Sequence, residues 1–70
     1  MADIDTTYRT QSETARKLRL SERTLERMRV EGRGPSFRKF GRRVVYADID
    51  VESWANARVF NSTAEADAAT

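Results

Sequence analysis

Two arginines, Arg23 and Arg27, are the side chains whose type and spacing best suit a defined chemistry in this chain. They lie four residues apart in a segment with helical spacing, so they stack one turn apart on the same helix face. The planar guanidinium group donates two parallel hydrogen bonds, which match the edge of a guanine base or a phosphate. We therefore predict that this face contacts duplex DNA.

The charge of the chain is distributed unevenly along its length. Residues 9–46 hold twelve Arg or Lys residues against four Glu, a net charge of +8, although the whole chain of 70 residues has only +2. A charge run is usually a solvated surface with ordinary ion pairs, and that alternative stays open. We favour nucleic-acid binding because the basic block coincides with two predicted short helices.

The composition argues against catalysis. The chain has no Cys and no His, so it lacks a thiolate metal site, a thiol nucleophile and the commonest general base. We expect a protein that is not an enzyme and needs neither a metal nor a cofactor. No apolar run approaches the roughly 20 residues that cross a bilayer, and the acidic start does not resemble a secretion signal. We therefore expect a cytoplasmic protein with no membrane partner.

The first predicted helix begins near residue 12. Ser12 is the expected N-cap, because its hydroxyl can accept a free backbone N–H. Ala15 and Leu18 lie three residues apart and share the inner face of this helix. A turn at residues 19–20 follows.

The second predicted helix carries the two arginines. Ser21 is its expected N-cap, and Leu25 and Met28 face the first helix. Gly32 ends the helix, since glycine adopts the left-handed conformation without a Cβ clash. At about ten residues the helix is ~15 Å long, which suits a major groove about 12 Å wide.

A basic hairpin and a third helix complete the predicted fold, which is mainly α with a small two-stranded wing. The strands are expected at residues 36–40 and 43–46, around Gly41 and Arg42. Asp48 is the expected N-cap of the third helix. Residues Val51 and Trp54 face the core, and Ile49 covers its edge.

Three regions are predicted. Residues 1–8 form a mobile N-terminus, residues 9–60 form the binding domain, and residues 61–70 form a disordered tail because they lack large apolar side chains.

Five short motifs follow one another in order along residues 14–54. They are Thr14-Ala15 with Leu18, Ser21 with Thr24-Leu25 and Arg27, Gly34-Pro35 with Phe37, Lys39-Phe40-Gly41-Arg42-Arg43-Val44 with Tyr46, and Asp50 with Trp54. This order resembles the small winged helix-turn-helix excisionase family, which includes AlpA-like regulators and is similar to the DNA-binding core of MerR regulators. The resemblance covers roughly residues 8–58 and implies a winged helix-turn-helix fold.

The candidate DNA-contacting residues fall on three elements. Arg23 and Arg27 are the expected base readers, and Glu26 either accepts from cytosine or, as we favour, pairs with a neighbouring arginine. The hydroxyls of the second helix are expected to donate to phosphate. The full sets are Ser21, Glu22, Arg23, Thr24, Glu26 and Arg27 on the second helix, Arg38, Lys39, Arg42 and Arg43 on the wing, and Arg16 and Lys17 on the first helix.

The resemblance implies two functions that use the same chemistry. One is an excisionase, or recombination directionality factor, which binds repeated sites, bends DNA and turns a tyrosine or serine integrase toward excision. The other is a transcriptional regulator of a phage, plasmid or integrative element. A protein-interaction module that uses its basic face on an acidic partner is a third alternative. Because the sequence shows no long dimerisation helix, we expect copies to bind side by side on DNA, head to tail.

Overall fold

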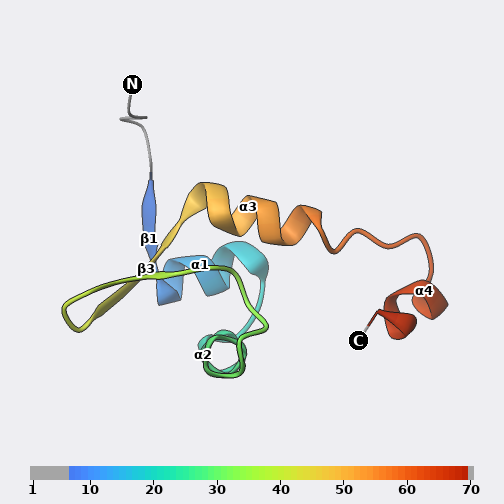
Figure 1. Ribbon diagram of the computed structural model, residues 1–70, viewed down its shortest axis with the longest axis horizontal. Helices are drawn as coiled ribbons and strands as arrows, with labels where there is room; N and C mark the ends of the chain where they lie inside the picture. The colour runs from blue at the N-terminus through green and yellow to red at the C-terminus, as the bar shows by residue number, and fades with distance from the viewer. Residues whose placement is uncertain (1–6, 70) are drawn as a thin grey trace.

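The computed structural model describes residues 7–69. The elements, in chain order, are β1 (Tyr8–Thr10), α1 (Gln11–Leu18), α2 (Glu22–Glu31), β2 (Arg38–Phe40), β3 (Arg43–Ala47), α3 (Asp48–Asn56) and α4 (Thr63–Ala68). Figure 1 shows α2 almost end-on, while α1 and α3 lie across the view and the β2–β3 hairpin projects to one side. The predicted mobile segment lies outside the described residues except at Thr7 and Tyr8, and Tyr8 already begins a strand.

Helix α1 begins two residues earlier than the sequence prediction. Its N-cap is Thr10, not Ser12: the Thr10 hydroxyl accepts from the amide of Glu13 at 3.1 Å. The Glu13 carboxylate in turn accepts from the amide of Thr10 at 2.9 Å, which completes a capping box and lowers the pKa of Glu13 below its usual value. The prediction of Ser12 as N-cap is therefore wrong, although the sequence contains the Thr-x-x-Glu spacing of a capping box at residues 10–13.

Both helices of the helix-turn-helix end in the same way. Arg19 after α1 has φ 60° and Gly32 after α2 has φ 75°, both in the left-handed region. In each case the next amide reaches back five residues, from Leu20 to Ala15 and from Arg33 to Met28, at 2.8 Å. This Schellman pattern satisfies the last carbonyls of a helix and usually uses glycine, so a left-handed Arg19 is strained.

Helix α2 begins as predicted. The Ser21 hydroxyl accepts from the amide of Thr24 at 3.0 Å, which confirms Ser21 as the N-cap. The prediction of Gly32 at its C-terminal end is also confirmed.

The sheet has three strands instead of the predicted two, in the order β1-β3-β2 and antiparallel throughout. Tyr8 pairs with Ala47 in β1–β3, and Phe40 pairs with Arg43 in β2–β3. The hairpin loop is therefore Gly41-Arg42, with Gly41 at φ 65°. A positive φ at the first of two loop residues is the type II′ arrangement, which matches the twist of the strands and favours glycine there.

Helix α3 starts without a side-chain cap. Its N-cap is Ala47, which makes no capping hydrogen bond, so the assignment of Asp48 as N-cap is wrong. Asp48 is instead the first residue of the helix, where a negative charge is favourable, and its carboxylate is used elsewhere.

The core lies between the helix pair, β3 and α3. Leu25, Tyr46 and Val51 are fully buried, and Ala15 is nearly so. The predicted inner positions Leu18 and Met28 also pack inward, the first partly and the second almost completely. Full burial of a Leu or Val side chain stabilises the fold by about 1.5–3 kcal/mol, so these few residues dominate a small core.

Two predicted core positions near α3 differ from expectation. Trp54 is only half-buried, and its indole N–H donates to the carbonyl of Arg33 at 3.0 Å. The Arg58 guanidinium stacks 4.3 Å above the Trp54 ring. Ile49 is 68% exposed and covers nothing. Trp54 thus links the loop that follows α2 to α3 from the edge of the core.

A short helix, α4, occupies Thr63–Ala68, where the sequence analysis predicts a disordered tail. Ser62 caps it by accepting from the amide of Glu65 at 3.1 Å. None of its described side chains is buried. Figure 1 places α4 at the end of the molecule away from the hairpin. Local capping, which a count of large apolar residues ignores, favours a helix at this position.

Candidate nucleic-acid interface

The outer face of α2 presents the two predicted base-reading arginines. Arg23, Glu26 and Arg27 are all exposed and line one shallow open groove on this helix. Within residues 7–69 neither arginine forms an ion pair. Both guanidinium groups therefore keep their donors for a ligand.

Glu26 is also unpaired within the described part of the chain. The sequence analysis favours an ion pair between Glu26 and Arg23 or Arg27, and the structure does not contain this pair. The groove consequently offers a free carboxylate between two free guanidinium groups. A carboxylate there can accept from the N4 amino group of cytosine, the role that the sequence analysis ranks second.

The N-terminus of α2 carries the predicted hydroxyl contacts. The Ser21 hydroxyl accepts the amide of Thr24 and donates to the Thr24 hydroxyl oxygen at 2.8 Å. Ser21 is therefore occupied by capping, whereas Thr24 keeps its own proton for a phosphate. Glu22 is exposed in the first turn, where its charge complements the helix dipole.

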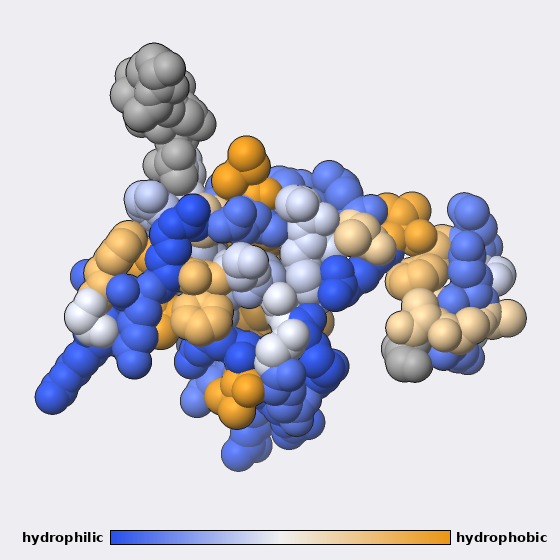
Figure 2. Space-filling model, viewed as in Figure 1, coloured by the Kyte–Doolittle hydropathy of each residue, from blue (hydrophilic) through white to orange (hydrophobic). Residues whose placement is uncertain are grey.

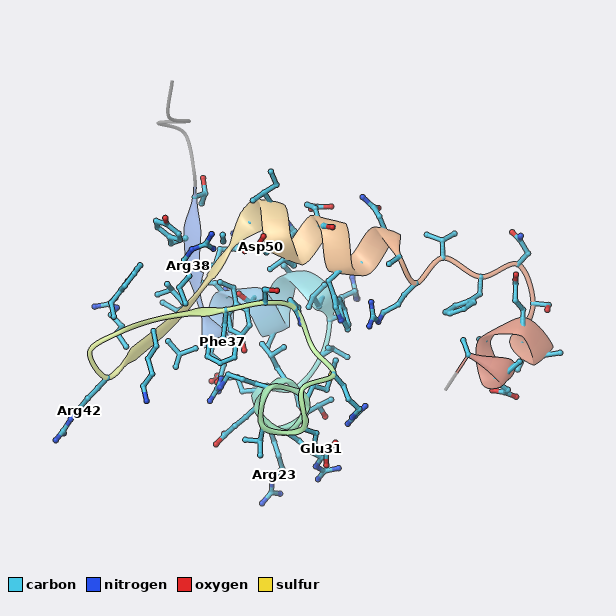
Figure 3. The ribbon with its side chains drawn as sticks, viewed as in Figure 1. Arg23, Glu31, Phe37, Arg38, Arg42 and Asp50 are labelled. Carbon is cyan, nitrogen blue, oxygen red and sulfur yellow. The ribbon has the colours of Figure 1, made fainter. Side chains whose placement is uncertain are left out.

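The wing residues divide into a free set and a paired one. Lys39, Arg42 and Arg43 are exposed, and none of them has an ion-pair partner within residues 7–69. Figure 3 shows Arg42 at the hairpin tip and Arg23 below α2, both projecting toward the same lower side of the view. Figure 2 shows that side covered mostly by hydrophilic side chains.

Arg38, in contrast, has an ion-pair partner. Its guanidinium group donates to the Asp50 carboxylate at 2.8 Å and lies 5.7 Å from the centre of the Tyr8 ring. The Tyr8 ring in turn meets Phe40 edge to face at 5.9 Å. Arg38 therefore ties the wing to α3 and β1.

The first helix shows the same division. Arg16 is exposed and, among the described residues, has no carboxylate partner. Lys17 pairs with Asp48 at 2.7 Å and with Glu52 at 2.7 Å. The hydrogen bonds to these two carboxylates raise the pKa of Lys17 above its usual value.

Asp48 joins three elements through its carboxylate. It accepts from Arg9 of β1 at 2.8 Å and from Lys17 of α1 at 2.7 Å. These hydrogen bonds lower the pKa of Asp48 to about 2. The bond from Arg9 contributes most, and the bond from Lys17 is second. An apparent helix cap is therefore the anchor of α3 against the sheet and α1.

Arg29 supports this interface from within the fold, although it is absent from the residues predicted to contact DNA. The side chain is partly buried on the inner side of α2 and donates to the Gln11 side-chain oxygen and, at 3.3 Å, to the Tyr46 hydroxyl. It also lies 5.8 Å from the centre of the Phe37 ring. Arg29 thus connects the recognition helix to α1, β3 and the start of the wing. Its position next to buried Met28 was the available signal.

The fold and this surface define a winged helix-turn-helix of the kind that binds DNA. A second helix with a free outer face lies beside a basic hairpin, and the free cations are exposed on both. The helix-turn-helix domain family matches residues 10–59, and the chain belongs to this family, which includes small DNA-binding proteins of the AlpA and excisionase type. No curated protein matches the chain significantly. Within residues 7–69 no helix has the length and apolar character needed to span a membrane.

Proposed function

We propose that this protein is an excisionase, an accessory factor that binds repeated DNA sites and directs an integrase toward excision. The ordered motifs of residues 14–54 and the family match at residues 10–59 support this assignment. The integrase, a tyrosine or serine recombinase, performs the strand cleavage. The protein itself has no catalytic role, and its contribution is to position and bend the DNA.

The observation that carries the proposal is a single small recognition module with free cations on both its helix and its wing. The longest helix among residues 7–69 is α2, with 10 residues, so the described chain offers no dimerisation helix of the MerR kind. One such module buries only about 600–1,000 Å² on DNA, too little for tight binding alone. Several copies on adjacent repeats supply the missing affinity and can bend the DNA between them.

The acidic start of α3 already has cationic partners within its own chain. Asp48, Asp50 and Glu52 are each held by a cation of their own chain, at 2.7–2.8 Å. A neighbour's basic wing would therefore compete with these internal pairs for the three carboxylates. We infer that head-to-tail association on tandem sites relies mainly on the spacing of the sites and on other surfaces.

The test is footprinting on duplex DNA that flanks the gene, followed by an excision assay with the adjacent integrase. The proposal expects protected tandem repeats beside an attachment site and excision that depends on the protein. Protection of a promoter alone, with integrase activity unaffected, would instead assign a transcriptional regulator. Binding that does not weaken with salt would favour an acidic protein partner.

A further inference from the structure

Val30 is an apolar side chain in a row of polar ones on the outer face of α2. At 77% it is the most exposed large apolar side chain of the described residues. It follows Arg27 by three residues and Arg23 by seven, so all three lie on one helix face. Val30 also lines the same groove as the two arginines and Glu26.

Val30 has no role in the packing of this fold. Its neighbour two residues earlier, Met28, is 8% exposed and faces the core, whereas Val30 stays outside the core cluster. A β-branched residue on an exposed helix surface is a weaker helix former than Ala, so Val30 does not stabilise α2 either. An isolated exposed apolar residue is common on proteins, but this one continues the row of base-reading side chains.

The spacing along α2 sets which bases these side chains reach. Seven residues advance about 10 Å along a helix axis, which corresponds to about three base-pair steps of ~3.4 Å. In the major groove thymine alone presents a methyl group, and apolar side chains recognise it by direct contact. The groove thus offers donors for guanine, an acceptor for cytosine and one apolar group.

We propose that Val30 reads a thymine through its C5 methyl group, about three base pairs from the guanine contacted by Arg23. The inference rests on the DNA-binding function of the chain and names one determinant of its sequence preference. It does not depend on whether the bound sites serve excision or transcription.

The test uses duplexes that the wild-type protein selects from a randomised library. Each thymine of the selected sequence is replaced in turn by uracil, which lacks only the methyl group. At one position the wild-type protein is expected to bind about fourfold more weakly, the factor for one buried methyl group. Val30→Ala is expected to bind thymine and uracil duplexes equally at that position and to respond like the wild type elsewhere.

Val59→Ala is the matched control, because Val59 is 72% exposed but does not line the groove. This variant is expected to keep the wild-type response to uracil. Circular dichroism checks that both variants keep their helices, as expected for exposed positions.

The possible outcomes separate this inference from the wider function. If the protein binds selectively but no position is sensitive to uracil, the role of Val30 is overturned and DNA binding stands. The same holds if Val30→Ala keeps the full uracil sensitivity of the wild type. A wild-type protein that selects no duplex overturns both. Loss of methyl discrimination in Val30→Ala alone establishes the contact.

Discussion

The outer face of α2 and the first turn of α3 lie in the same small domain and treat charged side chains in opposite ways. On α2, Arg23 and Arg27 are exposed without partners among residues 7–69. At α3, Asp48 and Asp50 gather Arg9, Lys17 and Arg38 into ion pairs of 2.7–2.8 Å. The basic block of residues 9–46 therefore contains two populations, one available to DNA and one that holds the elements together.

This division shows why a count of cations overstates a binding surface. Arg38 and Arg42 are both exposed wing residues four apart in sequence. Only Arg38 lies within reach of an α3 carboxylate. For these two arginines, distance from the acidic first turn of α3, and not residue type, decides which one stays free. Substitutions in the two populations should consequently change different properties.

The largest expected effect comes from Arg27→Ala. Loss of a bidentate contact to guanine costs about 1–3 kcal/mol of specific binding, or about 5- to 150-fold in affinity. The free energy of unfolding should change by less than about 0.5 kcal/mol, because the side chain is exposed and unpaired. Mobility-shift titrations on a footprinted site and on random duplex DNA measure the effect. An equal loss on both duplexes would make Arg27 a phosphate contact.

Arg29→Met is expected to have the next largest effect. Its main consequence is a lower free energy of unfolding. The substitution keeps most of the apolar bulk but removes the donors to Gln11 and to the Tyr46 hydroxyl. Loss of hydrogen bonds from a charged group destabilises the fold by about 1.5 kcal/mol, measured by urea unfolding. DNA affinity should also fall, because α2 loses its fixed position relative to the wing. Arg16→Met, at an exposed unpaired position, is the control, and equal stability of the two variants would contradict this role.

Arg38 and Arg42 test the comparison within one hairpin. The slope of log affinity against log salt falls by about 0.9 for each phosphate contact removed. Arg42→Ala should therefore reduce the slope by about 0.9, whereas Arg38→Ala should leave it unchanged and weaken the attachment of the wing to α3. Titrations over a range of salt concentrations give both slopes. A reduced slope in Arg38→Ala would show that DNA displaces Asp50.

The local signals in the sequence were sufficient for the helix-turn-helix but not for the sheet. Ser21 and Gly32 mark the ends of α2 by short-range hydrogen bonding and backbone conformation, which a sequence pattern records directly. Strand β1 has three residues and no strong β pattern. It exists because β3 offers a free edge, and that edge appears only after the chain has folded.

The sequence was sufficient to predict which cations belong to the candidate site, but not which of them form ion pairs within the fold. The exposure of Arg23, Arg27 and Arg42 follows from helix periodicity and from a hairpin tip, so sequence reasoning placed them well. The pairing of Lys17 with residues 31 and 35 positions later depends on how α3 crosses α1. Contacts at this sequence separation have no local pattern, which is also why Arg29 was missed.

The smallest effect concerns Asp48 and the acid stability of the domain. The carboxylate has a pKa of about 2 in the fold, below its ordinary value of 3.8, mainly because Arg9 donates to it. A group whose pKa is lowered by folding stabilises the fold above its unfolded pKa and loses that contribution as the pH falls. The stability should therefore decline between about pH 4 and pH 2, and Asp48→Asn should remove part of this decline in urea unfolding.

Glu13 provides the control for this pH dependence. The pKa of Glu13 is also lowered, through the amide of Thr10, so Glu13→Gln should remove a separate part of the acid response and leave that of Asp48. Each of these exposed carboxylates contributes little to the free energy of unfolding. The contributions of separate sites add, so the double variant should lose more of the acid response than either single variant. If Asp48→Asn left the acid response unchanged, the ion pairs of α3 would not stabilise the fold. The paired cations would then be as available to DNA as those of α2, and the division between the two regions would fail.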